Sequence, residues 1–234
     1  MRMQLASKLP AVGTTIFSVM SELAAKYNAV NLGQGFPDFE PPARLREALA
    51  RAVADGRNQY PPGIGVGALR EQIAYKTAAM YGRQTDSETE VTVTSGATEA
   101  IFAAIAATVS AGDEVVVLDP AYDCYVPAIE LQNATAIRVP LRQPDFAVDW
   151  QRVADAISPR TRMLIVNSPH NPTGAVLTAA DLDRLAQLLR DTPILVLADE
   201  VYEHIVFDGR THQSVARHDE LAARSFVSSS FGKT

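Results

Sequence analysis

The chain has 234 residues, of which 47% are hydrophobic and 21% charged, and a formal net charge of −6. This composition is that of a globular protein with a sizeable core, and the negative charge argues against nucleic acid or anionic membranes as the main partners. The single cysteine, Cys124, excludes an intramolecular disulfide and favours a reducing compartment. No signal peptide is visible before Pro10, and no apolar run has the length of a membrane span. We therefore expect a soluble, cytoplasmic protein.

The first forty residues differ from the rest of the chain. They contain one predicted helix, over residues 16–25, and the loop Asn31–Asp38. A second helix is predicted from Pro42, a residue tolerated in a first turn, to a stop at Gly56. We divide the chain into an N-terminal arm, residues 1–40, and a large domain, residues 41–234, with the boundary falling between 40 and 60.

The large domain alternates short apolar runs with helical patterns. The predicted strands are residues 90–94, 114–118, 134–139, 162–166, 194–198 and 225–228. The predicted helices are residues 68–80, 97–109, 123–131 and one that begins with a capping box at Thr178 and Asp181. Continuous runs of Val, Ile and Leu are typical of strands covered on both faces. The sequence therefore predicts an α/β fold with a mostly parallel sheet covered by helices.

Ligands of open parallel sheets bind beyond the carboxyl ends of the strands, so the residues that follow each strand are the candidates for a site. Ser95–Glu99 follows the first predicted strand and leads into a helix. Its small residues leave amides free for a phosphate, although a plain tight turn has the same composition. Tyr122 follows the second strand, where it would either stack on a flat heterocycle or lie in the core.

The later strands end on polar residues. Asn167–Gly174 contains two prolines that fix the loop around Asn171. Asp199 directly follows an apolar strand, where it either meets a cation or caps a turn. Lys233 follows a hydroxyl cluster and a glycine, as a nucleophilic amine would, although a lone lysine is more often a surface charge.

Taken together, these residue types match the requirements of pyridoxal 5'-phosphate. This cofactor has a phosphate to anchor, a pyridine nitrogen that needs a carboxylate, a phenolic oxygen that accepts hydrogen bonds and an aldehyde for a lysine.

Three motifs resemble the fold type I, class I and II aminotransferases: His170–Gly174, Asp199–Tyr202 and Ser229–Lys233. The arm and the stretch Pro120–Pro127 resemble the branch with methionine and kynurenine aminotransferases. The resemblance implies transfer of an amino group from an L-amino acid (methionine, aromatic or kynurenine-like) to a 2-oxo acid.

The resemblance also implies a role for each matching residue. Lys233 would hold the cofactor as a Schiff base and, once displaced, move a proton at the substrate's Cα. Asp199 would pair with the ring nitrogen, and that cation would lower the pKa of its carboxyl. The other positions would bind the phosphate (Ala97, Thr98 and Ser230), the phenolic oxygen (Tyr202 and Asn171), the ring face (Tyr122), the substrate (Gly35 and Asn171) and the phosphate of a neighbouring subunit in a homodimer (Tyr60).

The chain departs from this family by ending at Thr234. Members of the family continue with a second basic phosphate ligand, more sheet and a small domain that carries the carboxylate-binding arginine. We therefore expect a piece of a longer enzyme, with an unfinished sheet edge and an aggregation hazard.

Several alternatives compete with transamination. A carbon–sulfur β-lyase would use the same residues. A non-catalytic sensor domain of a transcription regulator would need a basic DNA-binding module ahead of the chain. A metal site at His204, His212, His218 and Glu200 lacks a helical ligand spacing, so no metal is expected. The glycines of residues 63–67 follow no strand, which argues against a nucleotide loop and favours a turn.

Overall fold

The computed structural model describes residues 6–35, 37 and 39–233. Phe36 and Asp38 of the predicted loop, the first five residues and Thr234 lie outside this range. The chain forms two compact units, residues 1–63 and residues 64–234. The proposed functional division at residue 40 stays a prediction. Among the described residues, no helix combines the length and apolar character needed to span a membrane.

The first unit contains the two predicted helices, α1 (Ile16–Tyr27) and α2 (Ala43–Ala54). Thr15 caps α1, because its hydroxyl accepts a hydrogen bond from the amide of Ser18. Pro42 lies one position before the first turn of α2, at the N-cap. Neither helix has a buried residue.

The second unit is a parallel five-stranded sheet with strand order β2-β1-β3-β4-β5. Its strands are β1 (Glu114–Asp119), β2 (Thr135–Pro140), β3 (Thr161–Asn167), β4 (Leu195–Asp199) and β5 (Ser225–Ser228). Its helices are α3 (Gly67–Tyr81), α4 (Ala97–Thr108), α5 (Tyr125–Glu130), α6 (Trp150–Ala156), α7 (Ala179–Leu189), α8 (Asp219–Ala222) and the 3₁₀ turn η1 (Val215–Arg217). The predicted α/β class, with a mostly parallel sheet, is confirmed.

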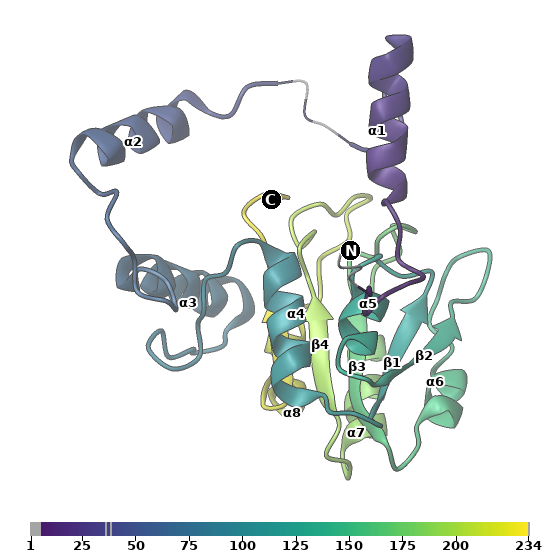
Figure 1. The fold of residues 1–234 in the computed structure, drawn as a ribbon. Coiled ribbons are helices and arrows are strands. Elements are labelled where there is room, and N and C mark those ends of the chain that lie inside the picture. Colours follow the sequence, from purple (N-terminus) through teal and green to yellow (C-terminus); the bar gives the residue numbers. More distant parts are fainter. Residues whose placement is uncertain (1–5, 36, 38, 234) are drawn as a thin grey trace. The chain divides into compact units, whose positions relative to one another are not determined.

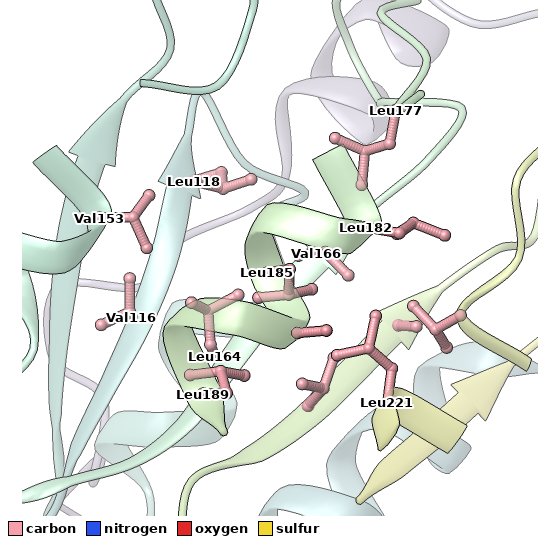
Figure 2. Close-up of a cluster of buried hydrophobic side chains, with 14 of the residues drawn as sticks. Val116, Leu118, Val153, Leu164, Val166, Leu177, Leu182, Leu185, Leu189 and Leu221 are labelled. Atoms are coloured by element: carbon pink, nitrogen blue, oxygen red, sulfur yellow. The ribbon is translucent and has the colours of Figure 1, made fainter. Parts of the chain in front are cut away.

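Helices cover both faces of the sheet (Figure 1). Alternate residues of a strand enter two separate cores, one on each face. Val115 and Val117 pack with α4 and α5, whereas Val116 and Leu118 pack on the opposite face. Figure 2 shows this second core, where Leu185 and other α7 leucines meet β3. Each fully buried aliphatic side chain contributes about 1.5–3 kcal/mol to folding. The sheet is therefore a rigid support for the loops at its carboxyl edge.

Five of the six predicted strands are confirmed, and the prediction for residues 90–94 is wrong. Val93 makes a backbone bond to the Ile64 carbonyl at 3.0 Å, but no strand pairs with this segment within the described part of the chain. An alternating Val pattern does not make a strand without a neighbour to share its hydrogen bonds. β5 lies at one edge of the sheet, as expected, and its Phe226 and Val227 are exposed. The sequence also gave no prediction for α6 or α8.

Residues 63–67 form a turn into α3, as predicted. Gly65 has a φ of +99°, and a Cβ there would lie 2.7 Å from the side chain of Val93. The glycine is therefore required by a close approach of two backbone segments.

Candidate functional site

The carboxyl ends of three neighbouring strands bring polar residues into line. Asn167 of β3 pairs in register with Asp199 of β4, which pairs in register with Ser228 of β5. All three residues are buried. The strand order reverses between β1 and β3, and ligands of open α/β sheets bind at such a point.

Asp199 is the buried acid at the centre of this edge, with a relative exposure of 3%. Its carboxylate accepts a hydrogen bond from the Tyr125 hydroxyl at 2.5 Å and from the Val201 amide at 3.3 Å. Burial raises the pKa of this carboxyl, and the two hydrogen bonds lower it by less. The expected lowering of the pKa depends on a cation beside the carboxyl and stays a prediction, because the two groups that bind Asp199 here are neutral donors. Such an acid is suited to bind a cationic ring nitrogen.

Tyr125 was not predicted as a site residue. It lies in the first turn of α5, is buried, and is in edge contact with Tyr122 at 5.8 Å between ring centroids. Tyr122 precedes the predicted helix of residues 123–131, so helical spacing did not connect the two rings, and no local pattern marked Tyr125 as a site residue. The partner on β4 was not deducible, since it is 74 residues away in sequence.

The loop after β3 is braced against β4 by one asparagine. The side-chain amide of Asn167 donates to the Asp199 carbonyl at 2.8 Å, and its oxygen accepts from the Asn171 amide at 2.7 Å. The His170 ring is hydrogen-bonded to the Thr173 hydroxyl at 2.8 Å, and burial lowers the pKa of this histidine. The predicted position of Asn171 at this edge is thus fixed by side-chain contacts as well as by the two prolines.

The phosphate turn predicted at Ser95–Glu99 forms the start of α4. Gly96 has a φ of +82° at the N-cap and provides no side chain to cap the helix. The amides of Ala97 and Thr98 lie in the first turn, where the helix carries partial positive charge. A helix of 12 residues with an uncapped start is a suitable anion site.

The segment after β5 carries the predicted lysine. The Nζ atom of Lys233 lies 6.0 Å from the centroid of the Tyr202 ring. The hydroxyl of Ser230 accepts a hydrogen bond from the Gly232 amide at 3.1 Å, and so holds the last turn of this segment. Lys233 and Tyr202 therefore share one side of the site.

A groove of about 430 Å³ lies between α4 and α5. Its walls are mostly apolar and include Thr98 and Cys124 but neither Asp199 nor Lys233. Burial raises the pKa of the Cys124 thiol to about 12, so this thiol is a poor nucleophile. The groove borders the predicted phosphate turn, but the predicted catalytic lysine and its partner acid are not among its lining residues.

The remaining candidate residues belong to the first unit or to the metal site that the sequence argued against. Gly35 and Tyr60 belong to the first compact unit, and their roles stay predictions. His212 is hydrogen-bonded to Glu200 at 3.0 Å, whereas His218 is 3.6 Å from Asp183. Within the described ranges, no three His, Cys, Asp or Glu side chains form a group able to hold a metal.

The residues present fit pyridoxal phosphate on two observations. A buried carboxylate with a raised pKa favours a cationic partner, and the start of α4 favours an anion. Lys233 is the amine nearest in sequence to this edge, five residues after Ser228.

A family model for aminotransferase class I and II matches residues 27–234. The chain belongs to this family. Methionine aminotransferase of Escherichia coli strain K12 is 53% identical over 228 residues, which are 97% of this chain and 59% of that protein. Human kynurenine–oxoglutarate transaminase 3 is 35% identical, with 98% of this chain and 53% of that protein covered.

Solved aminotransferases have the same fold. A crystal structure of the Escherichia coli methionine aminotransferase superposes with a TM-score of 0.95 at 51% identity, over 99% of this chain and 61% of that one. The N-succinyldiaminopimelate aminotransferase of Mycobacterium tuberculosis gives a TM-score of 0.94 at 46% identity, over 98% and 60% of the two chains. The chain thus spans about three fifths of the relatives it matches, and it has the fold of their large domain.

Proposed function

We propose that this chain provides the cofactor site of a pyridoxal phosphate-dependent aminotransferase that moves an amino group from an L-amino acid to a 2-oxo acid. The donors we propose are methionine, aromatic or kynurenine-like amino acids. One observation carries the proposal: the buried acid Asp199, whose two hydrogen-bond donors are neutral, lies in register between Asn167 and Ser228, and the chain continues from Ser228 to Lys233.

The residues would divide the chemistry among themselves. Bound pyridoxal phosphate supplies an aldehyde for an amine and an electron-withdrawing ring. Asp199 would keep a proton on the ring nitrogen, because a buried carboxylate is stabilised by a cation beside it. Lys233 would hold the cofactor covalently as a Schiff base and, when displaced, move a proton at the substrate's Cα.

The other side chains would orient the cofactor. The amides of Ala97 and Thr98, with the hydroxyl of Ser230, would bind the phosphate. Asn171 and Tyr202 would donate to the phenolic oxygen, and Tyr122 would stack on the ring. Each of these groups is carried by a segment that follows a strand or starts a helix, so a rigid sheet sets their spacing.

The proposal extends to the first unit and to assembly. Tyr60 would reach the phosphate of a neighbouring subunit, and Gly35 would lie beside the substrate. This requires a homodimer, so sedimentation of the longest reading frame that contains this chain should give twice the monomer mass. A monomer with full activity would contradict the role of Tyr60.

Replacing Lys233 tests the function. In the same full-length protein, Lys233→Ala should lower turnover of methionine with a 2-oxo acid by at least about a thousandfold, because Lys76, which also lies at this edge, is held by the Glu203 carboxylate at 2.6 Å. Borohydride reduction followed by mass spectrometry should find the cofactor on the Lys233 peptide of the unsubstituted protein and not in the variant. Lys26→Ala, which removes a surface lysine of α1, is the matched control.

Two outcomes would contradict the proposal. Full turnover in Lys233→Ala would remove the lysine from the reaction. Release of pyruvate from a sulfur amino acid without any 2-oxo acid would show elimination in place of transamination.

A further inference from the structure

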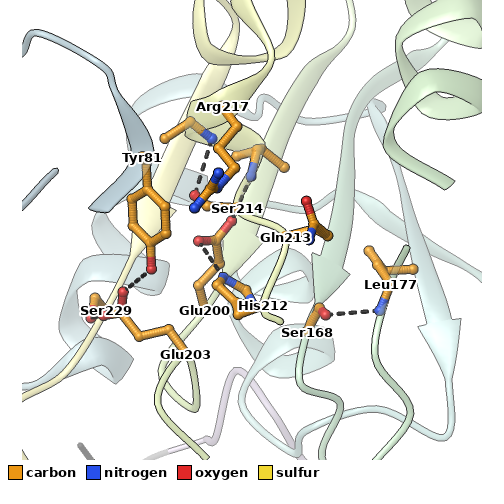
Figure 3. Close-up of polar contacts among 12 residues, drawn as sticks. Tyr81, Ser168, Leu177, Glu200, Glu203, His212, Gln213, Ser214, Arg217 and Ser229 are labelled. Carbon is orange, nitrogen blue, oxygen red and sulfur yellow. Dashed lines mark hydrogen bonds and ion pairs between the residues drawn. The ribbon is translucent and has the colours of Figure 1, made fainter. Parts of the chain in front are cut away.

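Glu203 is a buried carboxylate that the proposed reaction does not use. It follows Tyr202 directly and has a relative exposure of 6%. Its oxygens accept hydrogen bonds from Lys76 Nζ at 2.6 Å, from Ser229 Oγ at 2.6 Å and from the Tyr81 hydroxyl. Figure 3 shows the Tyr81 ring directed at the Glu203 carboxylate beside Ser229. A buried acid with three donors is costly to assemble unless the arrangement serves the fold or the site.

The carboxylate stays ionised despite its burial. Burial raises the pKa of Glu203, but hydrogen bonds from Lys76, Ser229 and Tyr81 lower it by more, so the pKa lies below its ordinary value. The three hydrogen bonds to Glu203, which we call the tie, are therefore charge-assisted at neutral pH. Such hydrogen bonds are about twice as strong as those between neutral groups.

This one side chain connects three distant segments. Lys76 and Tyr81 both come from α3, 127 and 122 residues away in sequence. Ser229 is the first residue after β5, 26 residues away. Glu203 itself belongs to the loop after β4, so α3 and two loops of the sheet edge meet at its carboxylate.

The connection reaches both sides of the lysine site. Tyr202, whose ring lies 6.0 Å from Lys233 Nζ, precedes Glu203. Ser229 stands four residues before Lys233 and directly follows β5. The last ladder contact of β5 is the hydrogen bond from the Glu200 amide to the Ser228 carbonyl at 2.8 Å. The Ser229–Glu203 bond extends this fastening one residue further, into the segment that carries the lysine.

Glu200, the other acid of this loop, makes different contacts from Glu203. Its carboxylate accepts from the Val215 amide at 2.9 Å and is hydrogen-bonded to His212 at 3.0 Å, so it fixes the loop to η1 (Figure 3). Glu203 is the acid of this loop that bonds to the lysine-bearing segment.

We propose that Glu203 is a positioning residue, which holds the Ser229–Lys233 segment and the Tyr202 loop in one geometry by binding Ser229, Lys76 and Tyr81 together. The inference rests on the proposed role of Lys233. Reactions that depend on an oriented amine lose about a hundredfold in rate for a misplacement of about 1 Å, and supporting contacts set that geometry.

The test removes one of the three donors to Glu203. Ser229→Ala removes one hydroxyl and leaves Glu203 with Lys76 and Tyr81. Ser225→Ala is the matched control, because the Ser225 hydroxyl bonds to the Leu221 carbonyl at 2.7 Å, at the opposite end of the same strand. Glu203→Gln, which keeps the shape and an acceptor, and Glu203→Ala, which keeps neither, complete the series in the full-length protein.

Three measurements are compared across the variants. Relative to Ser225→Ala, Ser229→Ala should lower kcat about tenfold and move the pH midpoint of the bound cofactor's visible absorbance by about 0.5 unit or more. In the cofactor-free protein, hydrogen exchange of residues 229–233 should be about tenfold faster, since local opening is easier. Glu203→Ala should give the largest changes, and Glu203→Gln should recover most of them.

The inference is overturned if Ser229→Ala and the Glu203 variants match Ser225→Ala in all three measurements. If Glu203→Ala does not fold, Ser229→Ala still decides the matter. Exchange in the cofactor-free protein does not depend on the reaction, so an active Lys233→Ala protein would refute the proposed function without hiding the result for the tie.

Discussion

Two buried carboxylates, four residues apart, experience opposite environments. Glu203 has a cation and two hydroxyl donors, and the pKa of its carboxyl is lowered. Asp199 has a hydroxyl and an amide, and the pKa of its carboxyl is raised. Burial penalises the charge of both, so the difference comes from their partners. Glu203 forms an ion pair with Lys76 of the same chain, whereas Asp199 is bound by two neutral donors, which suits the cationic ring nitrogen that we propose as its partner.

Among substitutions of these two acids and their partners, the replacement of Asp199 is expected to have the largest effect. Asp199→Asn should weaken binding of pyridoxal phosphate by about a hundredfold, because the loss of one partner of a buried charge pair costs about 3 kcal/mol. Titration of the cofactor-free protein, followed by absorbance, measures this. Asp191→Asn, at an exposed acid, is the control, and equal affinities of the two variants would show that Asp199 meets no cation.

The same variant should melt at a higher temperature than the unsubstituted protein when no cofactor is bound. The folded pKa of Asp199 is raised, so its contribution to stability is complete below the ordinary value of 3.8 and is lost as pH rises through the folded pKa. Asparagine has no such loss, so the difference in melting temperature should be largest at neutral pH and vanish in acid.

Removal of the cation beside Glu203 should have an intermediate effect and the opposite pH dependence. Lys76→Met should lower the free energy of unfolding by about 2 kcal/mol at pH 7, less than for a fully buried pair because the lysine is partly exposed. The folded pKa of Glu203 is lowered, so its stabilisation is present above the ordinary value of 4.5 and is lost as pH falls through the folded pKa. Urea unfolding across this range should show the two proteins converging in acid, and Lys26→Met should show no such change.

The smallest effect is expected at the Tyr125 hydroxyl, which donates a hydrogen bond to Asp199. Tyr125→Phe removes a hydrogen bond to a charged group and should cost about 1.5 kcal/mol of stability at neutral pH in the cofactor-free protein. The loss should shrink as Asp199 takes up a proton. Thermal melts at several pH values measure it beside Tyr75→Phe, where the ring is exposed. A loss that stays constant with pH would show that the hydroxyl contributes packing only.

Local patterns predicted most of the fold. Five apolar runs became strands, and the capping box at Thr178 and Asp181 begins α7. Residues 90–94 alternate Val with Thr and were also predicted as a strand, but a strand depends on a neighbour, which the local pattern does not contain. The short helix α6 was missed because its seven residues show little periodicity, although Asp149 caps it.

The site was predictable where strand ends fix it and hidden where distant segments meet. Asp199 and Asn171 were found because parallel strands end at one edge. The contacts of Tyr125 with Asp199 and of Glu203 with α3 join residues 74 and more than 120 apart, a relation that neither motif nor spacing records. The direction of the Asp199 pKa also depended on its neighbours, which only the fold assembles.

The close approach at Gly65 affects the start of α4, where we propose that an anion binds. Among the described residues, the backbone hydrogen bond that supports Val93 runs from its amide to the Ile64 carbonyl. Any side chain at position 65 would collide with Val93. The glycine turn therefore supports the stretch that leads to Ala97, which no strand of the described residues pairs with. A turn that resembles a nucleotide loop in composition thus supports the anion site that we propose, by setting where the helix begins.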